Sequence, residues 1–245
     1  MANLRLPAAP AVLFLAMSGM ASAATMQAVY TGTVFTGSVD QTSLFGAGGS
    51  LDGLAFRMTF AYDPDTPGAS RTTDAVRDEV FGGSVSGFTS PMRSAKLTIN
   101  RHTEKFNTGY TAGVQAYNIG TYSTIAHGTY FESSDGRISK ITQLDGFVAS
   151  GSGRFLADLD ASVPRTSLSL AGDPSGVGHF VIAECTYDNA GGCGATVRTM
   201  GTLAPSSLTI APIPLPAGLP LLASGLAVLG LAGLGRRRAG RLADA

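Results

Sequence analysis

The stretch LAFRMTFAYD, from Leu54 to Asp63, decides the fold class of this chain. Apolar side chains occupy every second position: Leu54, Phe56, Met58 and Phe60. Because side chains alternate between the two faces of a β-strand, these four residues share one face. The stretch therefore predicts a strand with one dry face and one wet face, as in an antiparallel sheet.

Similar short alternating segments recur along the chain, separated by turn clusters such as DPDTPG, SSDG and AGDPSG. They are AVYTGTVFTGSV, SAKLTIN, GTYSTIAHGTYFE, RISKITQLDGFVA, TSLSLAG, GHFVIAEC and ATVRTMGTL. Roughly ten strands spaced in this way predict an all-β fold, an antiparallel, jelly-roll-like β-sandwich. We expect aromatic residues to fill the space between its sheets, namely Phe35, Phe56, Phe60, Phe88, Phe147 and Phe180.

Two segments between the expected strands are less regular. RTTDAVRDEVFGG, residues 71–83, fits either a short helix or a charged loop. LFGAGGSLDG, residues 44–53, is rich in glycine but lacks the GK[ST] of a phosphate-binding loop. It is interpreted as a flexible connection between the first two strands.

The N-terminus has the three parts of a secretory signal peptide. Arg5 gives a positive charge, residues 11–20 form a short apolar run, and Ala21-Ser22-Ala23 fits the small residues that signal peptidase accepts. The apolar run is too short to span a membrane. We expect cleavage after Ala23, so that residues 1–23 are removed and residues 24–210 form the exported domain.

The C-terminus, residues 211–245, carries a second apolar segment. Residues 215–234 contain no charged side chain, and 20 residues give a helix of about 30 Å, the thickness of a bilayer core. A cluster of arginines follows: Arg236, Arg237 and Arg238. Under the positive-inside rule this tail stays in the cytoplasm, so the sequence predicts a type I transmembrane precursor whose β domain is exported.

The proline-rich start of this segment resembles a known signal. Ile213-Pro214-Leu215-Pro216-Ala217, followed by the apolar run and the arginines, is similar to the PEP-CTERM class of sorting signals, and most closely to its VPLPA variant, with Ile in place of Val. The resemblance covers roughly the last 35 residues. It implies processing by an exosortase, a membrane-embedded enzyme of Gram-negative bacteria. It also implies delivery to the cell surface or extracellular matrix, often alongside exopolysaccharide.

Charge and cysteine content describe the exported part further. With five basic residues and one acidic residue of the two ends set aside, twelve Lys and Arg face sixteen Asp and Glu. This acidic balance, without a dense basic patch, argues against nucleic-acid binding.

Cys185 and Cys193 flank a turn-rich loop, and export favours a disulfide between them that staples a hairpin. A redox or metal-binding pair would need a different spacing.

No motif indicates catalysis, a metal or a cofactor. The three histidines, His102, His127 and His179, lack metal-binding spacing and are interpreted as surface or strand residues. GSVSG, residues 83–87, is not a nucleophile elbow and is interpreted as strand. Four glutamates are present, but no pair is singled out for glycoside hydrolysis: Glu79, Glu104, Glu132 and Glu184.

Loop carboxylates and tyrosines leave alternatives open. Asp63 and Asp65 fit either a calcium site or turn-stabilising caps, with caps favoured, and DLDAS, residues 158–162, is similar. Four tyrosines fit either sugar stacking or ordinary strand positions: Tyr110, Tyr117, Tyr122 and Tyr130.

The sequence thus favours a non-enzymatic surface or matrix protein with a structural or adhesive role. A carbohydrate-binding sandwich that tethers exopolysaccharide is the alternative, and a secreted hydrolase a third.

Overall fold

The computed structural model describes residues 25–153, 155–156, 158–188 and 193–213, and these residues form β-strands and loops. The prediction of an all-β, antiparallel fold is confirmed. The strands are β1 (Met26–Val34), β2 (Val39–Asp40), β3 (Ala55–Tyr62), β4 (Ser70–Thr73), β5 (Arg77–Gly82), β6 (Met92–Ile99), β7 (His102–Phe106), β8 (Thr111–Ile119), β9 (Tyr122–Ser134), β10 (Ile138–Ser150), β11 (Arg165–Ser169), β12 (Ser175–Tyr187) and β13 (Cys193–Pro212).

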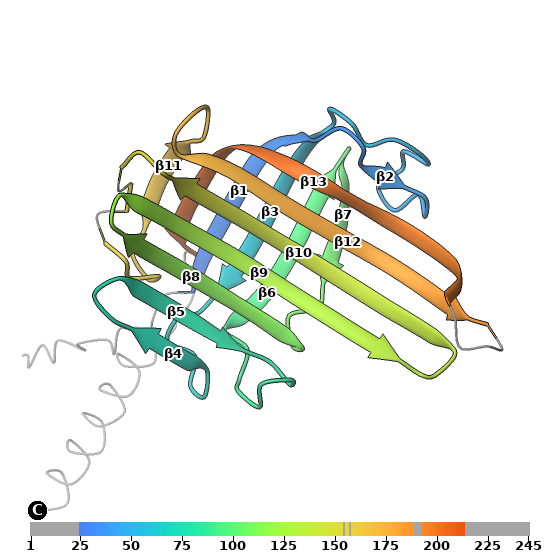
Figure 1. Cartoon of the computed structure of the whole chain (residues 1–245), viewed down its shortest axis with the longest axis horizontal. Helices are drawn as coiled ribbons and strands as arrows, with labels where there is room; N and C mark the ends of the chain where they lie inside the picture. The colour runs from blue at the N-terminus through green and yellow to red at the C-terminus, as the bar shows by residue number, and fades with distance from the viewer. Residues whose placement is uncertain (1–24, 154, 157, 189–192, 214–245) are drawn as a thin grey trace, which may run out of the picture.

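All strands belong to one curled antiparallel sheet with the order β4-β5-β8-β9-β10-β12-β13-β1-β3-β6-β7. The sheet curls into a half-barrel, so that β1, β3, β6 and β7 lie behind β8, β9, β10 and β12 (Figure 1). We call β4, β5, β8, β9, β10 and β12 the front layer, and β1, β3, β6 and β7 the back layer. One continuous sheet therefore supplies both layers of a sandwich-like fold, through the shared strand β13.

The hydrophobic core lies between the two layers. Phe60 of β3 and Leu97 of β6 face Leu144 of β10 and Phe180 of β12, and all four side chains have no exposed surface. Burying an aliphatic or aromatic side chain of this size contributes roughly 1.5–3 kcal/mol relative to leaving it in water. Gly146 of β10 lets the layers approach closely, because a Cβ there would lie 2.5 Å from the Met58 methyl group.

The predicted stripe of LAFRMTFAYD is largely confirmed. Phe56, Met58 and Phe60 are buried on one face of β3, while Arg57 on the opposite face is exposed. The wider prediction about aromatic residues is confirmed only in part. Phe180 is buried like Phe56 and Phe60, whereas Phe147 is half-buried and lies on the outer face of β10, between the buried positions Gly146 and Val148.

Two further aromatic residues expected in the core are not there. Phe35 follows the end of β1 and is 58% exposed, and Phe88 is 46% exposed in the loop after β5. Neither residue belongs to a long strand, so the alternation that buries their neighbours does not extend to them. The prediction that Phe35 and Phe88 lie in the core was wrong, because it rested on their apolar side chains alone.

Several segments differ from the expected local structure. RTTDAVRDEVFGG is neither helix nor loop but contains most of the hairpin β4–β5, closed by a turn in which Val76 N–H donates to Asp74 Oδ1 at 3.0 Å. Strands β7 and β8 were not among the predicted segments. GSVSG forms a turn rather than a strand, with Ser86 Oγ donating to the Gly83 carbonyl at 3.0 Å.

The glycine-rich segment 44–53 is held in place rather than flexible. The Asp40 side chain has no exposed surface, and it accepts hydrogen bonds at 2.9 Å from the N–H groups of Leu44 and Phe45. The Thr199 hydroxyl of β13 donates to the same carboxylate at 2.9 Å. These bonds hold the loop so that Phe45 and Leu51 are buried at one end of the core.

The two ends of the described chain lie side by side. Met26 of β1 pairs with Pro212 of β13, and the Ile213 N–H donates to the Thr25 carbonyl at 2.7 Å. Strand β13 thus runs two residues past the expected boundary at residue 210. The predicted signal peptide, residues 1–23, and the predicted helix, residues 215–234, lie outside the described residues.

The part of the chain that the structure describes contains no helix with the length and apolar character needed to span a membrane.

The hairpin expected around the cysteines is present in the backbone, since β12 pairs antiparallel with β13 and Tyr187 lies opposite Cys193. The predicted disulfide depends on the side chain of Cys193, a residue of which the structure describes only the backbone. The bond between Cys185 and Cys193 therefore stays a prediction.

Candidate functional site

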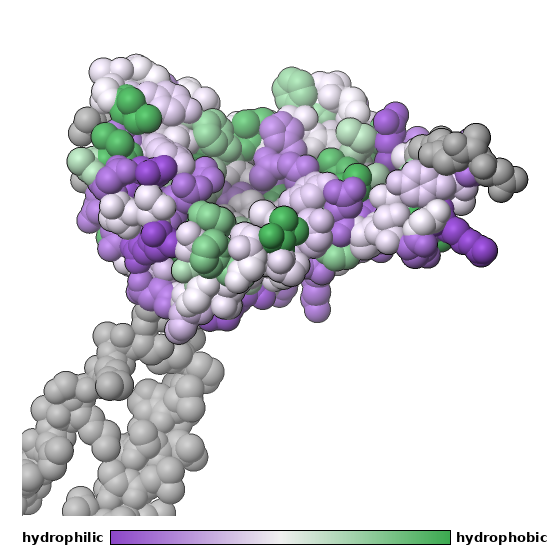
Figure 2. All heavy atoms as spheres, turned by 60° about the horizontal axis from the view of Figure 1, so that its bottom comes forward, coloured by the Kyte–Doolittle hydropathy of each residue, from purple (hydrophilic) through white to green (hydrophobic). Residues whose placement is uncertain are grey.

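The face of the front layer that points away from the core carries a groove of about 590 Å³. It lies above β5, β8, β9 and β10, and small residues form its floor. Gly113 of β8 lies opposite Gly128 of β9, with Ala126 two residues before Gly128 on the same face. Figure 2 shows this side of the molecule hollowed near its middle, with apolar and polar residues mixed around the hollow.

One wall of the groove is built from paired polar side chains of β5 and β8. Glu79 lies opposite Gln115 in the β5–β8 register, and Gln115 Nε2 donates to Glu79 Oε1 at 2.9 Å. The Tyr117 hydroxyl donates to the other oxygen, Oε2, at 3.4 Å. Partial burial, and then the neighbouring carboxylate, raise the pKa of Tyr117, so its hydroxyl stays a neutral donor at physiological pH.

The opposite wall repeats this arrangement on β10 and β12. Asp145 lies opposite both Gly128 of β9 and His179 of β12. Its carboxylate accepts from Gln143 Nε2 at 2.8 Å and lies 2.9 Å from His179 Nδ1. Each wall therefore holds one carboxylate and one amide in a fixed mutual orientation, which is an arrangement suited to binding hydroxyl groups.

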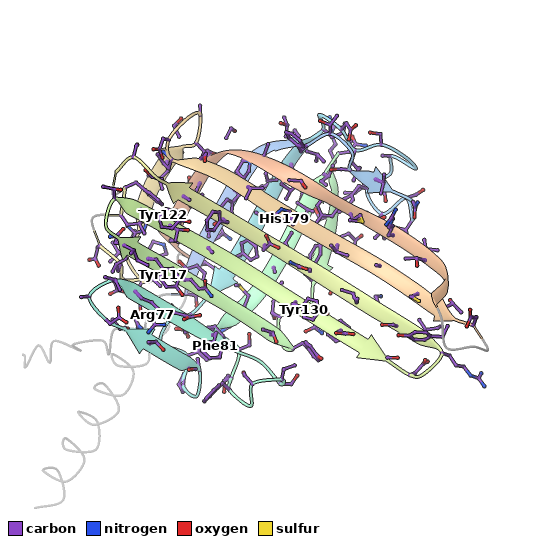
Figure 3. The ribbon with its side chains drawn as sticks, in the orientation of Figure 1. Arg77, Phe81, Tyr117, Tyr122, Tyr130 and His179 are labelled. Carbon is purple, nitrogen blue, oxygen red and sulfur yellow. The ribbon has the colours of Figure 1, made fainter. Side chains whose placement is uncertain are left out.

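Aromatic rings stand at one end of the groove. Phe81 of β5 and Tyr130 of β9 line it, and Tyr110 packs against Tyr130 with ring centroids 6.1 Å apart. The Tyr130 hydroxyl donates to Glu132 Oε2 at 2.8 Å, and this bond raises its pKa. Figure 3 shows Phe81, Tyr130 and His179 spread across the face of the front layer that is turned towards the viewer.

The four tyrosines considered for sugar stacking have different roles. Tyr130 lines the groove, Tyr110 supports it, and Tyr117 contacts the groove carboxylate Glu79. Tyr122 begins β9, is 41% exposed and is not among the groove residues. Tyr130 is therefore an ordinary strand residue and also a candidate for sugar stacking, because its position in β9 places its ring in the groove on the outer face.

The three histidines are not brought together. His102 lies on β7 at the edge of the back layer, and His179 lies beside the groove. His127 is a core residue, 1% exposed, which corrects its interpretation as a surface residue while its strand position holds. Among the described residues, no group of three His, Cys, Asp or Glu side chains is arranged to hold a metal ion.

A second cluster of charges lies at β4 and β5 and is engaged within the fold. Arg71 binds Asp78 through two bonds of 3.0 Å and contacts Asp65 at 2.6 Å and Asp160 at 3.3 Å. Burial raises the pKa of Asp78, but hydrogen bonds from Arg71, a backbone N–H and a hydroxyl lower it more strongly, so it lies below its usual range. These contacts tie the loop around residue 160 to the front layer.

The loop aspartates considered for calcium act as turn caps. Asp63 Oδ1 accepts from the Asp65 N–H at 3.1 Å, and Asp63 Oδ2 pairs with Arg93 at 3.1 Å. Asp158 Oδ1 accepts from the Asp160 N–H at 2.9 Å. These bonds follow the Asx-turn pattern, in which a short carboxylate satisfies backbone donors close by.

Sequence reasoning missed Gln115, Gln143 and Asp145 as groove residues. Each stands at an outward position of its strand, where a polar residue is unremarkable by itself. Their significance comes from the register, which aligns them around Gly113 and Gly128. Two glycines in outward mid-strand positions were the available signal, since glycine weakens a strand and often marks a close approach by a ligand or another backbone.

No protein-family model matches the chain, and no curated protein or solved structure matches it significantly.

Proposed function

We propose that this chain is an exported cell-surface or extracellular-matrix protein of a Gram-negative bacterium, with a structural or adhesive role. In this proposal a signal peptidase removes residues 1–23, and an exosortase-type enzyme recognises Ile213 to Ala217. The membrane helix, residues 215–234, and the arginines Arg236 to Arg238 hold the precursor in the inner membrane until then. The mature protein acts without catalysis and without a cofactor.

The observation that carries the proposal is the position of the sorting motif relative to the sheet. Strand β13 ends at Pro212, and Ile213 is held against Thr25 by a hydrogen bond of 2.7 Å. Cleavage after Ala23 and near Pro214–Ala217 would therefore remove no strand residue. The two facing layers of the curled sheet are consistent with the sandwich-like exported domain of this proposal.

Intact-mass measurement of the surface-associated protein from the native cell tests this proposal. We expect the mass of a chain that begins at Ala24 and has lost the peptide after the Pro214–Ala217 region. Replacing Pro214 and Pro216 by Ala should leave the C-terminal segment attached, whereas Pro220→Ala, outside the motif, should be processed normally. A surface-associated wild-type chain that keeps residues 218–245 would contradict the proposal.

A carbohydrate-binding role is the second candidate, and the groove on the outer face favours it. In this version the exported domain tethers exopolysaccharide. The groove combines aromatic rings, amides and carboxylates, which are the groups that hold the apolar faces and hydroxyls of sugars. Its volume of about 590 Å³ falls within the usual range of small-molecule sites.

The spacing of the groove carboxylates favours binding over glycoside hydrolysis. Glu79 on β5 and Asp145 on β10 are separated by three strand spacings, because β8 and β9 lie between them. Three spacings amount to about 14 Å between backbones. Glycosidases place their two carboxyl groups roughly 5 to 9.5 Å apart. The hydrogen bonds to Gln143 and His179 also hold Asp145 towards its own side of the groove.

A further inference from the structure

We propose that the groove binds a saccharide chain that carries no acidic groups, and that it discriminates against uronic-acid polymers. This inference rests on the carbohydrate-binding role and adds a site and a ligand class to it. Three features of the groove carry it: the open floor, the charge of the walls and the hydrogen-bonding groups.

The floor of the groove is open because glycine, which has no side chain, occupies two of its positions. Gly113 and Gly128 lie in regular strands without a positive φ, so the backbone conformation requires glycine at neither position. At Gly113 the neighbouring strand favours glycine, because a Cβ there would lie 3.1 Å from the Val80 carbonyl oxygen. A Cβ on Gly128 would meet the Asp145 Cβ at 3.4 Å, an ordinary contact. A larger side chain at Gly128 would therefore be tolerated by the fold and would occupy the groove. Mid-strand glycine costs stability, so its presence at Gly128, where only ordinary contacts surround the position, needs a reason, and ligand approach supplies one.

The charges of the groove exclude anions. Glu79 and Asp145, one on each wall, are the charged residues among the described groove residues, which include no Lys or Arg. Arg77 lies on the same face of β5 but pairs with Asp74 at 3.2 Å. A uronate seated between the two carboxylates would meet like charges from both sides at distances within the screening length of physiological salt. A neutral chain meets no such repulsion.

The hydrogen-bonding groups suit hydroxyls. Each carboxylate accepts one amide N–H, from Gln115 or from Gln143, and has a second polar contact, with Tyr117 or with His179. An ionised carboxylate has about four lone-pair sites, so each can still accept a further hydrogen bond. Each amide retains its carbonyl oxygen and a second N–H. A sugar hydroxyl can donate to the carboxylate and accept from the amide at once, whereas a carboxylate ligand could only accept. Phe81 and Tyr130 add ring surface for the apolar face of a sugar.

Affinity gel electrophoresis of the mature exported protein tests the inference. The gels contain a neutral polymer (hydroxyethyl cellulose, laminarin, soluble starch or galactomannan) or the acidic polymer polygalacturonate. We expect retardation by at least one neutral polymer and none by polygalacturonate. Gly128→Val, which fills the groove, should weaken retention at least tenfold. Gly49→Val is the matched control, because a Cβ there meets nothing within 4 Å and the backbone has no positive φ.

The outcomes separate this inference from the role on which it rests. Retention by polygalacturonate as strong as by any neutral polymer would overturn the charge selection and leave saccharide binding standing. Equal retention of Gly128→Val and wild type would overturn the groove as the site. No retention by any polymer would overturn both the carbohydrate-binding role and this inference.

A charge-neutral variant gives an independent test. Glu79→Gln combined with Asp145→Asn keeps the size of both side chains and removes both negative charges. We expect this variant to gain retention by polygalacturonate, with circular dichroism confirming that it is folded. A folded variant that still shows no retention by polygalacturonate would count against charge as the cause of the selectivity.

Discussion

At the scale of single residues, His127 is a titratable side chain buried in the core. Its Nδ1 lies 2.8 Å from the Tyr30 hydroxyl, and its ring stacks on Phe60 with centroids 5.7 Å apart. Its Nε2 has no hydrogen-bond partner among the described residues. Burial, and then the positive charge of Arg165, lower the pKa of His127 to about 3. The imidazole is therefore neutral in the folded protein at any pH above about 3.

This burial predicts a loss of stability in mild acid. Since the unfolded chain binds a proton near pH 6.5 and the folded chain does not until about pH 3, stability is complete above pH 6.5 and falls as the pH is lowered towards 3. Between pH 7 and pH 5 the free energy of unfolding should fall by about 2 kcal/mol. Urea titrations at pH 7 and pH 5 measure this change in the free energy of unfolding.

His127→Gln is the matched variant, because glutamine keeps a polar group in the site and does not titrate. Whatever the stability of this variant at pH 7, its free energy of unfolding should fall much less than that of the wild type between pH 7 and pH 5. An equal loss in both proteins would assign the acid sensitivity to other groups.

At the scale of elements, the pairing of β1 with β13 contains a bulge that glycine makes possible. The register shifts between Thr31 and Gly32, opposite Pro205. A Cβ on Gly32 would lie 2.1 Å from the Ala204 carbonyl oxygen, which is far inside contact distance. Proline lacks a backbone N–H and is confined in sheets to edges and bulges, so Pro205 and Gly32 fit this irregular position together.

Gly32→Ala should therefore destabilise the protein. The added methyl group meets backbone on the neighbouring strand and cannot be accommodated by a side-chain rotation, so we expect a cost of about 1–3 kcal/mol or more. Gly49→Ala, where the space is open, should change stability by less than about 0.5 kcal/mol. Urea unfolding midpoints compare the two, and a wild-type midpoint for Gly32→Ala would refute the close contact.

At the scale of the whole molecule, β13 joins the front and back layers. Leu203 is the point of connection, because it lies opposite Gly178 of β12 on one side and Val34 of β1 on the other. Its side chain has no exposed surface. The first part of β13 thus belongs with the front layer and the rest with the back layer, so neither layer can lose this strand without exposing the shared core.

Leu203→Ala should weaken the whole molecule rather than one layer. We expect a loss of about 2–5 kcal/mol, the usual cost of such a core truncation. Unfolding followed by far-ultraviolet circular dichroism and by tyrosine fluorescence should give one coincident transition. Val197→Ala is the control, since Val197 is 46% exposed. Two separate transitions in Leu203→Ala would show that the layers unfold independently.

The amino-acid sequence by itself determined the class of fold. Alternation such as that of Phe56, Met58 and Phe60 is a local property, and the side-chain period of a strand converts it directly into a buried face. Strands β1, β3, β6, β9, β10, β11, β12 and β13 overlap the segments predicted for this reason. The composition of the two ends also gave the expected route of export, which depends on short segments and not on the fold.

Only the tertiary structure decided which strands are neighbours and where the groove lies. Consecutive strands β3 and β4 stand far apart in the sheet order, and β13 takes partners from both layers. Glu79 and Asp145 face one another across Gly113 and Gly128 because of this order. Backbone hydrogen bonds form the same ladder between almost any two strands, so the alternating pattern of one strand does not by itself say which strand is its partner. The candidate site is a product of that pairing.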